Sequence, residues 1–210
     1  MAGLPPVLLS HHQAGRLEAG VDEAGRGCLA GPVVAAAVIL PPVIDLPGLT
    51  DSKRLSHQAR LRLRPLIIEQ SLAWAIGMAS AARIDQVNIL NATYEAMHEA
   101  IANLHVVPEH LLIDGNRFRP YPGLDHTCMV RGDSRYLHIA AASVLAKTFR
   151  DDLMAILAKE FPAYQWASNK GYPTRAHKAA IQTHGPTRHH RRSFQWQPVP
   201  SLFPSDSDPS

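Results

Sequence analysis

The sequence predicts an α/β protein with a mixed central sheet flanked by helices. Short apolar runs rich in β-branched residues or alanine alternate with longer segments whose apolar residues recur at helical spacing. Two strand patterns come first, and strand and helix patterns then alternate, an order typical of helices layered on a sheet. The length of 210 residues and the apolar content of 46% are enough for one buried core.

In the first half of the chain, residues 55–70 predict a helix with Ser52 or Ser56 as its N-cap. Pro65 is expected to kink this helix or to end its regular part, because proline removes a backbone donor. Residues 84–104 carry apolar residues at helical intervals and predict a long amphipathic helix. The strands expected here are residues 17–22, 33–40 and 72–80.

In the second half, a segment rich in small residues predicts a long helix that packs closely on the sheet, with Asp133 or Ser134 as its N-cap. Residues 197–210, rich in proline and serine, predict a disordered tail. The remaining elements expected here are strands at residues 110–114 and 127–130 and helices at residues 135–159 and 174–183.

The positive charge gathers near the C-terminus. The net charge is only +3, but residues 161–205 hold six Lys and Arg and no acid, whereas residues 1–160 hold 15 basic and 16 acidic residues. Histidines and aromatic residues are interleaved in this basic region, a mixture suited to phosphates and stacked bases. The alternative is a solvated basic face, and residues 189–192 (HHRR) are expected to be solvated or to face phosphates.

Cysteine usage and hydropathy favour a cytoplasmic enzyme. Cys28 and Cys128 lie a hundred residues apart without metal-ligand spacing, so both are expected to be reduced thiols. The charge-free span at residues 27–44 is interrupted by prolines and is shorter than the ~20 apolar residues of a membrane helix. The first ten residues lack the basic start of a secretion signal.

Four acidic residues stand at the ends of predicted elements. Asp22 and Glu23 follow the first strand, Asp114 ends a buried strand, and Asp133 precedes the small-residue helix. Singly, they have ordinary explanations as a helix cap, a turn former or a surface residue. Together at one end of a sheet, they form an oxygen-rich site for hard divalent cations, which support phosphodiester hydrolysis.

The adjoining Gly25-Arg26-Gly27 loop predicts close contact with a substrate that carries phosphate. Its glycines allow a positive φ and let the backbone approach a ligand. An ion pair between Arg26 and Asp22 or Glu23 is a second interpretation, and it is compatible with the first.

Five motifs, in order, give the chain a resemblance to ribonuclease HII from about residue 17 to about residue 196. They are GVDEAGRG at residues 20–27, DSKRLS at 51–56, LLIDGN at 111–116, GDSRYLHIAAASVLAKTFRD at 132–151 and NKGYPT at 169–174. The resemblance implies an RNase H-like fold and an endonuclease that cuts the RNA strand of RNA–DNA hybrids. It also implies nicking on the 5′ side of single ribonucleotides in duplex DNA, with 3′-hydroxyl and 5′-phosphate ends.

The resemblance also implies roles for individual residues. The four acids would be the catalytic residues and would bind Mg²⁺ or Mn²⁺, and residues 25–27 would sense the ribose 2′-hydroxyl. Tyr172 would stack on the sugar that follows the ribonucleotide, and Lys53 and Lys147 would contact phosphates. Asp51 and Asp151 adjoin the motifs but stay outside the metal set.

The same resemblance divides the chain into a lead, a catalytic domain, a small helical basic region that binds substrate, and a tail. We expect a monomer. Ser201-Leu202-Phe203 loosely resembles a peptide that binds a sliding clamp, although Gln197 is out of register with the glutamine expected in such a peptide. The boundaries expected are residues 1–16, 17–160, 161–196 and 197–210.

Three rival functions differ in what they require. Residues 25–30 fit a loose dinucleotide-binding pattern, but they lead into a strand pattern instead of a helix, and two preceding carboxylates would repel a pyrophosphate. A non-catalytic nucleic-acid-binding module would not need four acids beside its phosphates. A related nuclease that requires several consecutive ribonucleotides is the nearest alternative.

Overall fold

The computed structural model describes residues 8–50 and 55–196 and contains one mixed five-stranded sheet in the order β3-β2-β1-β4-β5. β1 pairs antiparallel with β2 and parallel with β4, so the first strand lies at the centre. The remaining pairs are β2 with β3, antiparallel, and β4 with β5, parallel. The strands are β1 (Glu18–Ala24), β2 (Val33–Ile39), β3 (Ala73–Ala79), β4 (His110–Asp114) and β5 (Asp125–Met129).

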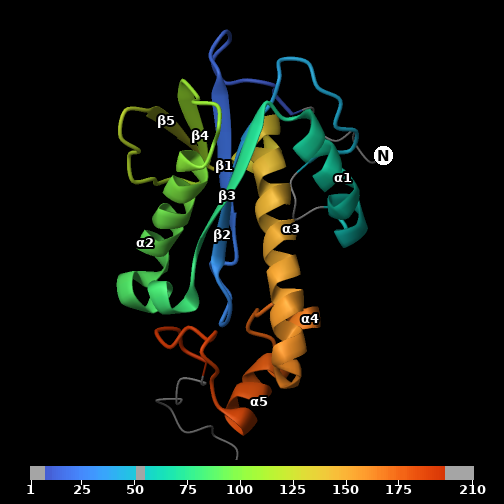
Figure 1. The fold of residues 1–210 in the computed structure, drawn as a ribbon, viewed down its shortest axis with the longest axis vertical. Helices are drawn as coiled ribbons and strands as arrows, with labels where there is room; N and C mark the ends of the chain where they lie inside the picture. The colour runs from blue at the N-terminus through green and yellow to red at the C-terminus, as the bar shows by residue number, and fades with distance from the viewer. Residues whose placement is uncertain (1–7, 51–54, 197–210) are drawn as a thin grey trace, which may run out of the picture.

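Helices cover both faces of the sheet (Figure 1). α2 packs on β2 and β3 on one face, and α3 packs on β1 and β2 on the other, with α1 beside it. α4 and α5 lie at the far end of α3. The helices are α1 (His57–Gln70), α2 (Ala81–Ala102), α3 (Leu137–Glu160), α4 (Trp166–Asn169) and α5 (Arg175–His184), and the single 3₁₀ turns are η1 (Gly132–Ser134) and η2 (Pro162–Tyr164).

Successive side chains of β2 point to opposite faces of the sheet and pack into two separate cores. Ala35 and Ala37 belong to the core under α2, whereas Ala36 and Val38 belong to the core under α1 and α3. All seven residues of β2 are buried, which explains why its sequence is a continuous apolar run. At Gly20 on β1, a Cβ would collide with the backbone of His138, so this glycine permits α3 to lie directly on the central strand.

The sequence-based prediction of an RNase H-like mixed sheet between helices is confirmed, with differences at element ends. α1 has Ser56 as its N-cap, as one of the two predicted choices, but it runs through Pro65 to Gln70 instead of ending there. α3 has Tyr136 as its N-cap with no side-chain bond, so the prediction that Asp133 or Ser134 caps this helix is wrong. Both residues lie in the preceding turn η1.

α2 begins earlier than predicted and is interrupted. The Ser80 hydroxyl accepts a hydrogen bond from the Arg83 N–H, which starts the helix at Ala81. Asn88 has a φ of 67°, which breaks the regular helix within α2. The predicted tail at residues 197–210 lies outside the described residues.

The described residues also bear on two earlier expectations. Cys28 and Cys128 are both free, in agreement with the expected reduced thiols. Within residues 8–50 and 55–196, no helix combines the length and the apolar character that crossing a bilayer requires.

Candidate active site

Three of the predicted acids converge at one edge of the sheet. β1 and β4 are parallel neighbours with Val21 opposite Ile113, which places the next residues, Asp22 and Asp114, side by side. The Gly132 N–H donates a 2.7 Å hydrogen bond to Asp114 Oδ1, and this contact brings the turn η1 and Asp133 to the same edge. One carboxylate oxygen from each acid lies within 4.8 Å of the others.

The position of Asp22 makes its negative charge unfavourable when no cation is present. The residue is only 4% exposed, and burial raises its pKa well above the ordinary value for an aspartate. The neighbouring charges of Glu23 and Asp114 raise the pKa further, although hydrogen bonds from the Ser143 side chain and the Glu23 N–H oppose this effect. A bound divalent cation would relieve both the burial cost and the repulsion.

Glu23 borders this group but has a different arrangement. Successive residues of a strand point to opposite faces, so Glu23 cannot point the same way as Asp22. Its Oε1 atom lies 3.4 Å from Arg26 Nη1. The sequence predicts an ion pair of Arg26 with Asp22 or Glu23, and the partner is Glu23. Its backbone N–H donates to Asp22 Oδ1 at 2.7 Å. The trio within 4.8 Å therefore consists of Asp22, Asp114 and Asp133, with Glu23 at its border.

One cavity gathers most of the predicted site residues. Its volume is about 260 Å³, and its lining includes three of the four acids, the glycine loop and the tyrosine, but not Asp133. A larger cavity of about 620 Å³, between the start of α2 and α3, contains none of the predicted site residues. The smaller cavity is lined by Asp22, Glu23, Ala24, Gly25, Arg26, Gly27, Arg60, Asp114, Ser143, Lys147 and Tyr172.

Tyr172 lines the same cavity as the acids and is 39% exposed. Two cations lie near its ring, with Lys147 Nζ at 5.8 Å and Arg150 Cζ at 5.9 Å from the ring centroid. Burial of the phenol is the main cause of its raised pKa, so the hydroxyl stays protonated at neutral pH. The ring therefore presents a neutral, partly open face to a ligand.

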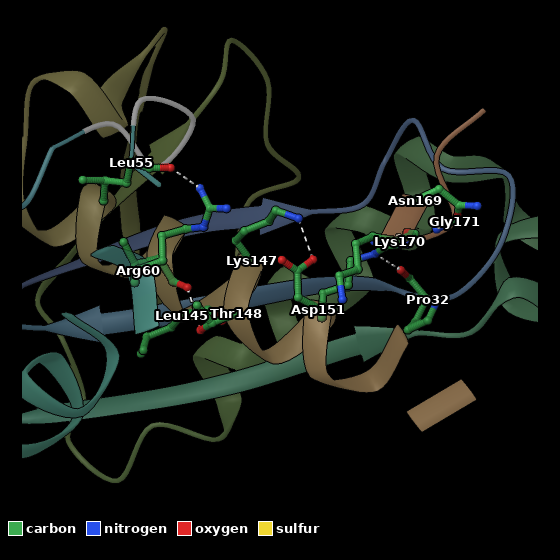
Figure 2. A network of polar contacts seen from close by, with 12 residues as sticks. Pro32, Leu55, Arg60, Leu145, Lys147, Thr148, Asp151, Asn169, Lys170 and Gly171 are labelled. Atoms are coloured by element: carbon green, nitrogen blue, oxygen red, sulfur yellow. Dashed lines mark hydrogen bonds and ion pairs between the residues drawn. The ribbon is translucent and has the colours of Figure 1, made fainter. Parts of the chain in front are cut away.

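Lys147 also lines this cavity, and its ammonium is paired with Asp151 one helical turn later on α3 (Figure 2). Asp151 is thus a partner of a cavity lysine and does not belong to the trio of Asp22, Asp114 and Asp133. Lys53, the other predicted phosphate contact, lies outside the described residues.

The sequence reasoning missed two polar residues of the cavity. Ser143 lies four residues before Lys147, so both side chains share one face of α3, a spacing visible in the sequence. Arg60 reaches the cavity from α1 and donates to the Leu55 carbonyl at 2.6 Å (Figure 2). Nothing in the local sequence distinguishes Arg60 from the other arginines of α1.

The expectation for the HHRR run at residues 189–192 is wrong at its two central residues. His190 is 2% exposed, and Arg191 is completely buried. The backbone of this run pairs with residues 29–31, through Gly31 N–H to His189 O at 2.9 Å and Arg191 N–H to Leu29 O at 2.8 Å. The run is therefore part of the protein interior beside the glycine loop, and tertiary contacts override its polar composition.

Known proteins resemble this chain over most of its length. The family model for ribonuclease HII matches residues 19–197. The chain belongs to the ribonuclease HII family. Ribonuclease HII of Parabacteroides distasonis is 58% identical over 192 residues, which cover 91% of this chain and 96% of the relative. Ribonuclease HII of Cytophaga hutchinsonii is 56% identical over 192 residues, which cover 91% and 95%.

Solved structures of related proteins share the fold. Ribonuclease H2 of Pyrococcus horikoshii superposes with a TM-score of 0.69 at 23% identity, covering 85% of this chain and 94% of that one. Ribonuclease HII of Archaeoglobus fulgidus, solved in complex with PCNA, gives a TM-score of 0.71 at 25% identity, covering 87% and 97%. A Bst ribonuclease HIII solved with Mn²⁺ gives 0.58 at 21%, covering 83% and 65%.

Membership of the ribonuclease HII family fixes the enzyme class. The chain is a ribonuclease H, a hydrolase that acts as an endonuclease on RNA–DNA hybrids. The acids and the glycine loop that the resemblance pointed to lie in the region matched by the family model.

Proposed function

We propose that this ribonuclease H nicks duplex DNA on the 5′ side of a single embedded ribonucleotide, using divalent cations held by Asp22, Asp114 and Asp133, with Glu23 at the border. The observation that supports this most is the shared cavity. Asp22, Glu23 and Asp114 line one space of about 260 Å³ together with the glycine loop and Tyr172, and Asp133 lies beside Asp22 and Asp114, so the groups expected to hold the metal and those expected to recognise the ribonucleotide would act on the same nucleotide.

The residues present fit a hard divalent cation. The carboxylate trio offers only oxygen ligands, and two of the three acids are almost fully buried. When bound, Mg²⁺ or Mn²⁺ would activate a water and stabilise the leaving 3′ oxygen. Both ions take oxygen ligands, so we propose that either supports the reaction. The products are a 3′-hydroxyl and a 5′-phosphate.

The remaining cavity residues would hold the nucleic acid. The loop at residues 25–27 offers backbone groups to the 2′-hydroxyl, the feature that distinguishes RNA from DNA at one position. The partly exposed ring of Tyr172 would stack on the sugar of the next nucleotide, where a second 2′-hydroxyl would be unfavourable. Lys147 would contact a phosphate, and Lys53 is proposed to do the same.

The test is to incubate the protein with duplex DNA containing one ribonucleotide, with Mg²⁺, with Mn²⁺ or with EDTA, and to map the nick. We expect a nick on the 5′ side of the ribonucleotide in either metal and none in EDTA. Cleavage of a continuous RNA–DNA hybrid without any nick at the single ribonucleotide would favour the alternative nuclease, which needs several consecutive ribonucleotides.

We also propose a sliding clamp as a partner. The ribonuclease HII of Archaeoglobus fulgidus was solved in complex with PCNA. The segment of this chain considered for such a contact, Ser201-Leu202-Phe203, lies outside the described residues. Deletion of residues 197–210 should abolish binding to the clamp in a pull-down with purified proteins, and unchanged binding would reject this segment as the contact.

A further inference from the structure

A completely buried arginine from the C-terminal region binds the backbone carbonyls of the glycine loop. Arg191 donates from Nη2 to Gly25 O at 2.7 Å and from Nη1 to Arg26 O at 2.8 Å. It also donates to Gly31 O from Nε at 3.1 Å and from Nη2 at 3.0 Å. A desolvated guanidinium costs several kcal/mol unless its donors are satisfied, and here the loop carbonyls satisfy them.

These bonds fix the direction in which the loop presents its backbone donors. In a planar trans peptide, the C=O and the following N–H point in opposite directions. Because the carbonyls of Gly25 and Arg26 point at Arg191, the N–H groups of Arg26 and Gly27 point away from it. Among the described residues, neither N–H has a hydrogen-bond partner within the chain. Arg191 thus orients the donors proposed to meet the 2′-hydroxyl.

A second buried arginine joins the residues just after the glycine loop to the segment that carries the tyrosine. Arg150, also completely buried, donates to Pro32 O at 2.9 Å, to Ala30 O at 3.0 Å and to Lys170 O at 2.9 Å. Figure 2 shows two of these acceptor residues, Pro32 and Lys170, on the same side of α3. Lys170 lies two residues before Tyr172, so one guanidinium links the stretch that follows the glycine loop to the segment that carries Tyr172.

The backbone of Tyr172 is bonded to His177, which is in turn hydrogen-bonded to His190, and both histidines are neutral. Trp166 Nε1–H donates to His177 Nε2 at 2.9 Å, so that nitrogen carries no proton. The proton of His177 is therefore on Nδ1, which donates to Tyr172 O at 2.9 Å. Thr187 N–H donates to His190 Nδ1 at 2.9 Å, which leaves the proton of His190 on Nε2, 3.2 Å from His177 Nε2.

Both sets of contacts start from the same short segment. Residues 187–191 contain the consecutive residues His190 and Arg191. The backbone of this segment pairs with residues 29–31, next to the glycine loop. The segment thus contacts the loop directly and reaches Tyr172 through His177.

We propose that Arg191 and His177 are positioning residues that set the distance and orientation between the glycine loop and Tyr172, and so determine the selection of the ribonucleotide–DNA junction. This inference rests on the proposed function, which assigns recognition to these two segments. Neither residue lines the catalytic cavity, so both act through the groups they hold. Their loss should change substrate selection more than the cutting of a continuous hybrid.

Two pairs of variants test this inference. Arg191→Lys keeps the charge but loses the forked geometry that reaches several carbonyls at once. Arg62→Gln, on an exposed position of α1, is the control for a change at a distant arginine.

His177→Asn keeps an amide N–H near the position of Nδ1, whereas His177→Gln keeps a polar atom near Nε2 and loses the bond to Tyr172 O. The pair separates the contact with Tyr172 from the contact with Trp166.

The first measurement is kcat/KM on a duplex with one ribonucleotide divided by kcat/KM on a continuous hybrid. We expect this ratio to fall about 10- to 100-fold in Arg191→Lys and His177→Gln, with smaller changes in His177→Asn and none in Arg62→Gln. An unchanged ratio in folded Arg191→Lys and His177→Gln overturns the inference. If Arg191→Lys does not fold, the His177 pair alone decides.

The second measurement is hydrogen–deuterium exchange of peptides covering residues 24–31 and 170–174, without substrate. We expect faster exchange in Arg191→Lys at the first segment and in His177→Gln at the second. If the wild type fails to nick single ribonucleotides while exchange changes as expected, the proposed function fails and the positioning role stands. If the wild type nicks as proposed while exchange and ratio are unchanged, only the positioning role fails.

Discussion

The backbone N–H of Gly132 donates a 2.7 Å hydrogen bond to Oδ1 of Asp114, and this contact links two acids that come from different elements. Asp114 ends β4, whereas Asp133 lies in the turn η1. A Cβ at position 132 would lie 2.5 Å from Ile139 Cδ1 and 3.0 Å from Met129 Cβ, so the glycine lets this turn pack beside Asp114 without displacing those side chains. The acid cluster depends on backbone packing as much as on the acids themselves.

The metal-free protein should be destabilised by its own acids. Asp22 is buried beside Glu23 and Asp114, and its raised pKa reports the cost of its charge. We expect Asp22→Asn to raise the thermal unfolding midpoint in EDTA at pH 8. Mn²⁺ should raise the midpoint of the wild type and have a smaller effect on the variant, because binding to the folded state stabilises it. Differential scanning calorimetry with and without Mn²⁺ checks both effects, and equal midpoints throughout would argue against a cation site here.

The glycine loop should tolerate a methyl group at one glycine and not at the other. Gly25 has a φ of +95°, and a Cβ there would overlap the Arg150 guanidinium. Gly27 has open space where its Cβ would lie. We expect Gly25→Ala to lower the free energy of unfolding by at least about 2 kcal/mol, and Gly27→Ala to change it by less than about 1 kcal/mol. Urea denaturation checks this, and similar losses in both variants would contradict the account of the loop.

The ring of Tyr172 should matter more than its hydroxyl. Tyr172→Ala removes the stacking surface. We expect the enzyme's preference for the ribonucleotide–DNA junction over a continuous hybrid to fall roughly tenfold in this variant. Tyr172→Phe keeps the ring and should retain most of the preference. A competition assay with both substrates in one tube measures this, and equal discrimination by wild type and Tyr172→Ala would remove the proposed role.

Stability should fall in mild acid through His190. Burial is the main cause that lowers the pKa of His190 from 6.5 to about 4, and nearby His177 and His189 add to it. Between these two pH values the unfolded state binds more protons, so the stabilisation present above pH 6.5 is lost as the pH falls towards 4. The loss amounts to at most about 3 kcal/mol.

A variant isolates this effect from the other titrating groups. His190→Gln keeps a donor near the position of Nε2 and does not ionise. We expect the difference in unfolding free energy between wild type and variant to shrink as the pH falls from 7 to 4. A difference that stays constant over this range would show that His190 does not titrate as described.

The sequence was sufficient for the parts of the fold that depend on local patterns. β2 is predicted within one residue because its continuous apolar run needs burial on both faces, and α5, predicted at residues 174–183, is found at Arg175–His184. The acids Asp22, Asp114 and Asp133 could be grouped because each stands at the end of a predicted element, although β1 in fact continues past Asp22 to Ala24.

Features created by contacts between distant residues could not be predicted. Arg191 bonds to Gly25 across 166 positions, and Arg150 to Ala30 across 120, so neither burial is visible in the local sequence. The start of α3 likewise involves a distant residue, because the Leu137 N–H donates to Leu9 O at 2.9 Å. Charged residues are ordinarily exposed, and the sequence alone therefore favoured a solvated HHRR run.

The most direct test of the acid cluster as the catalytic centre is the cleavage rate of Asp22→Asn on the single-ribonucleotide duplex at saturating Mn²⁺. Circular dichroism and the unfolding midpoint establish that the variant is folded. We predict a rate at least about 100-fold below that of the wild type, because the substitution removes a charged oxygen ligand. A folded variant that nicks at close to the wild-type rate would contradict the account.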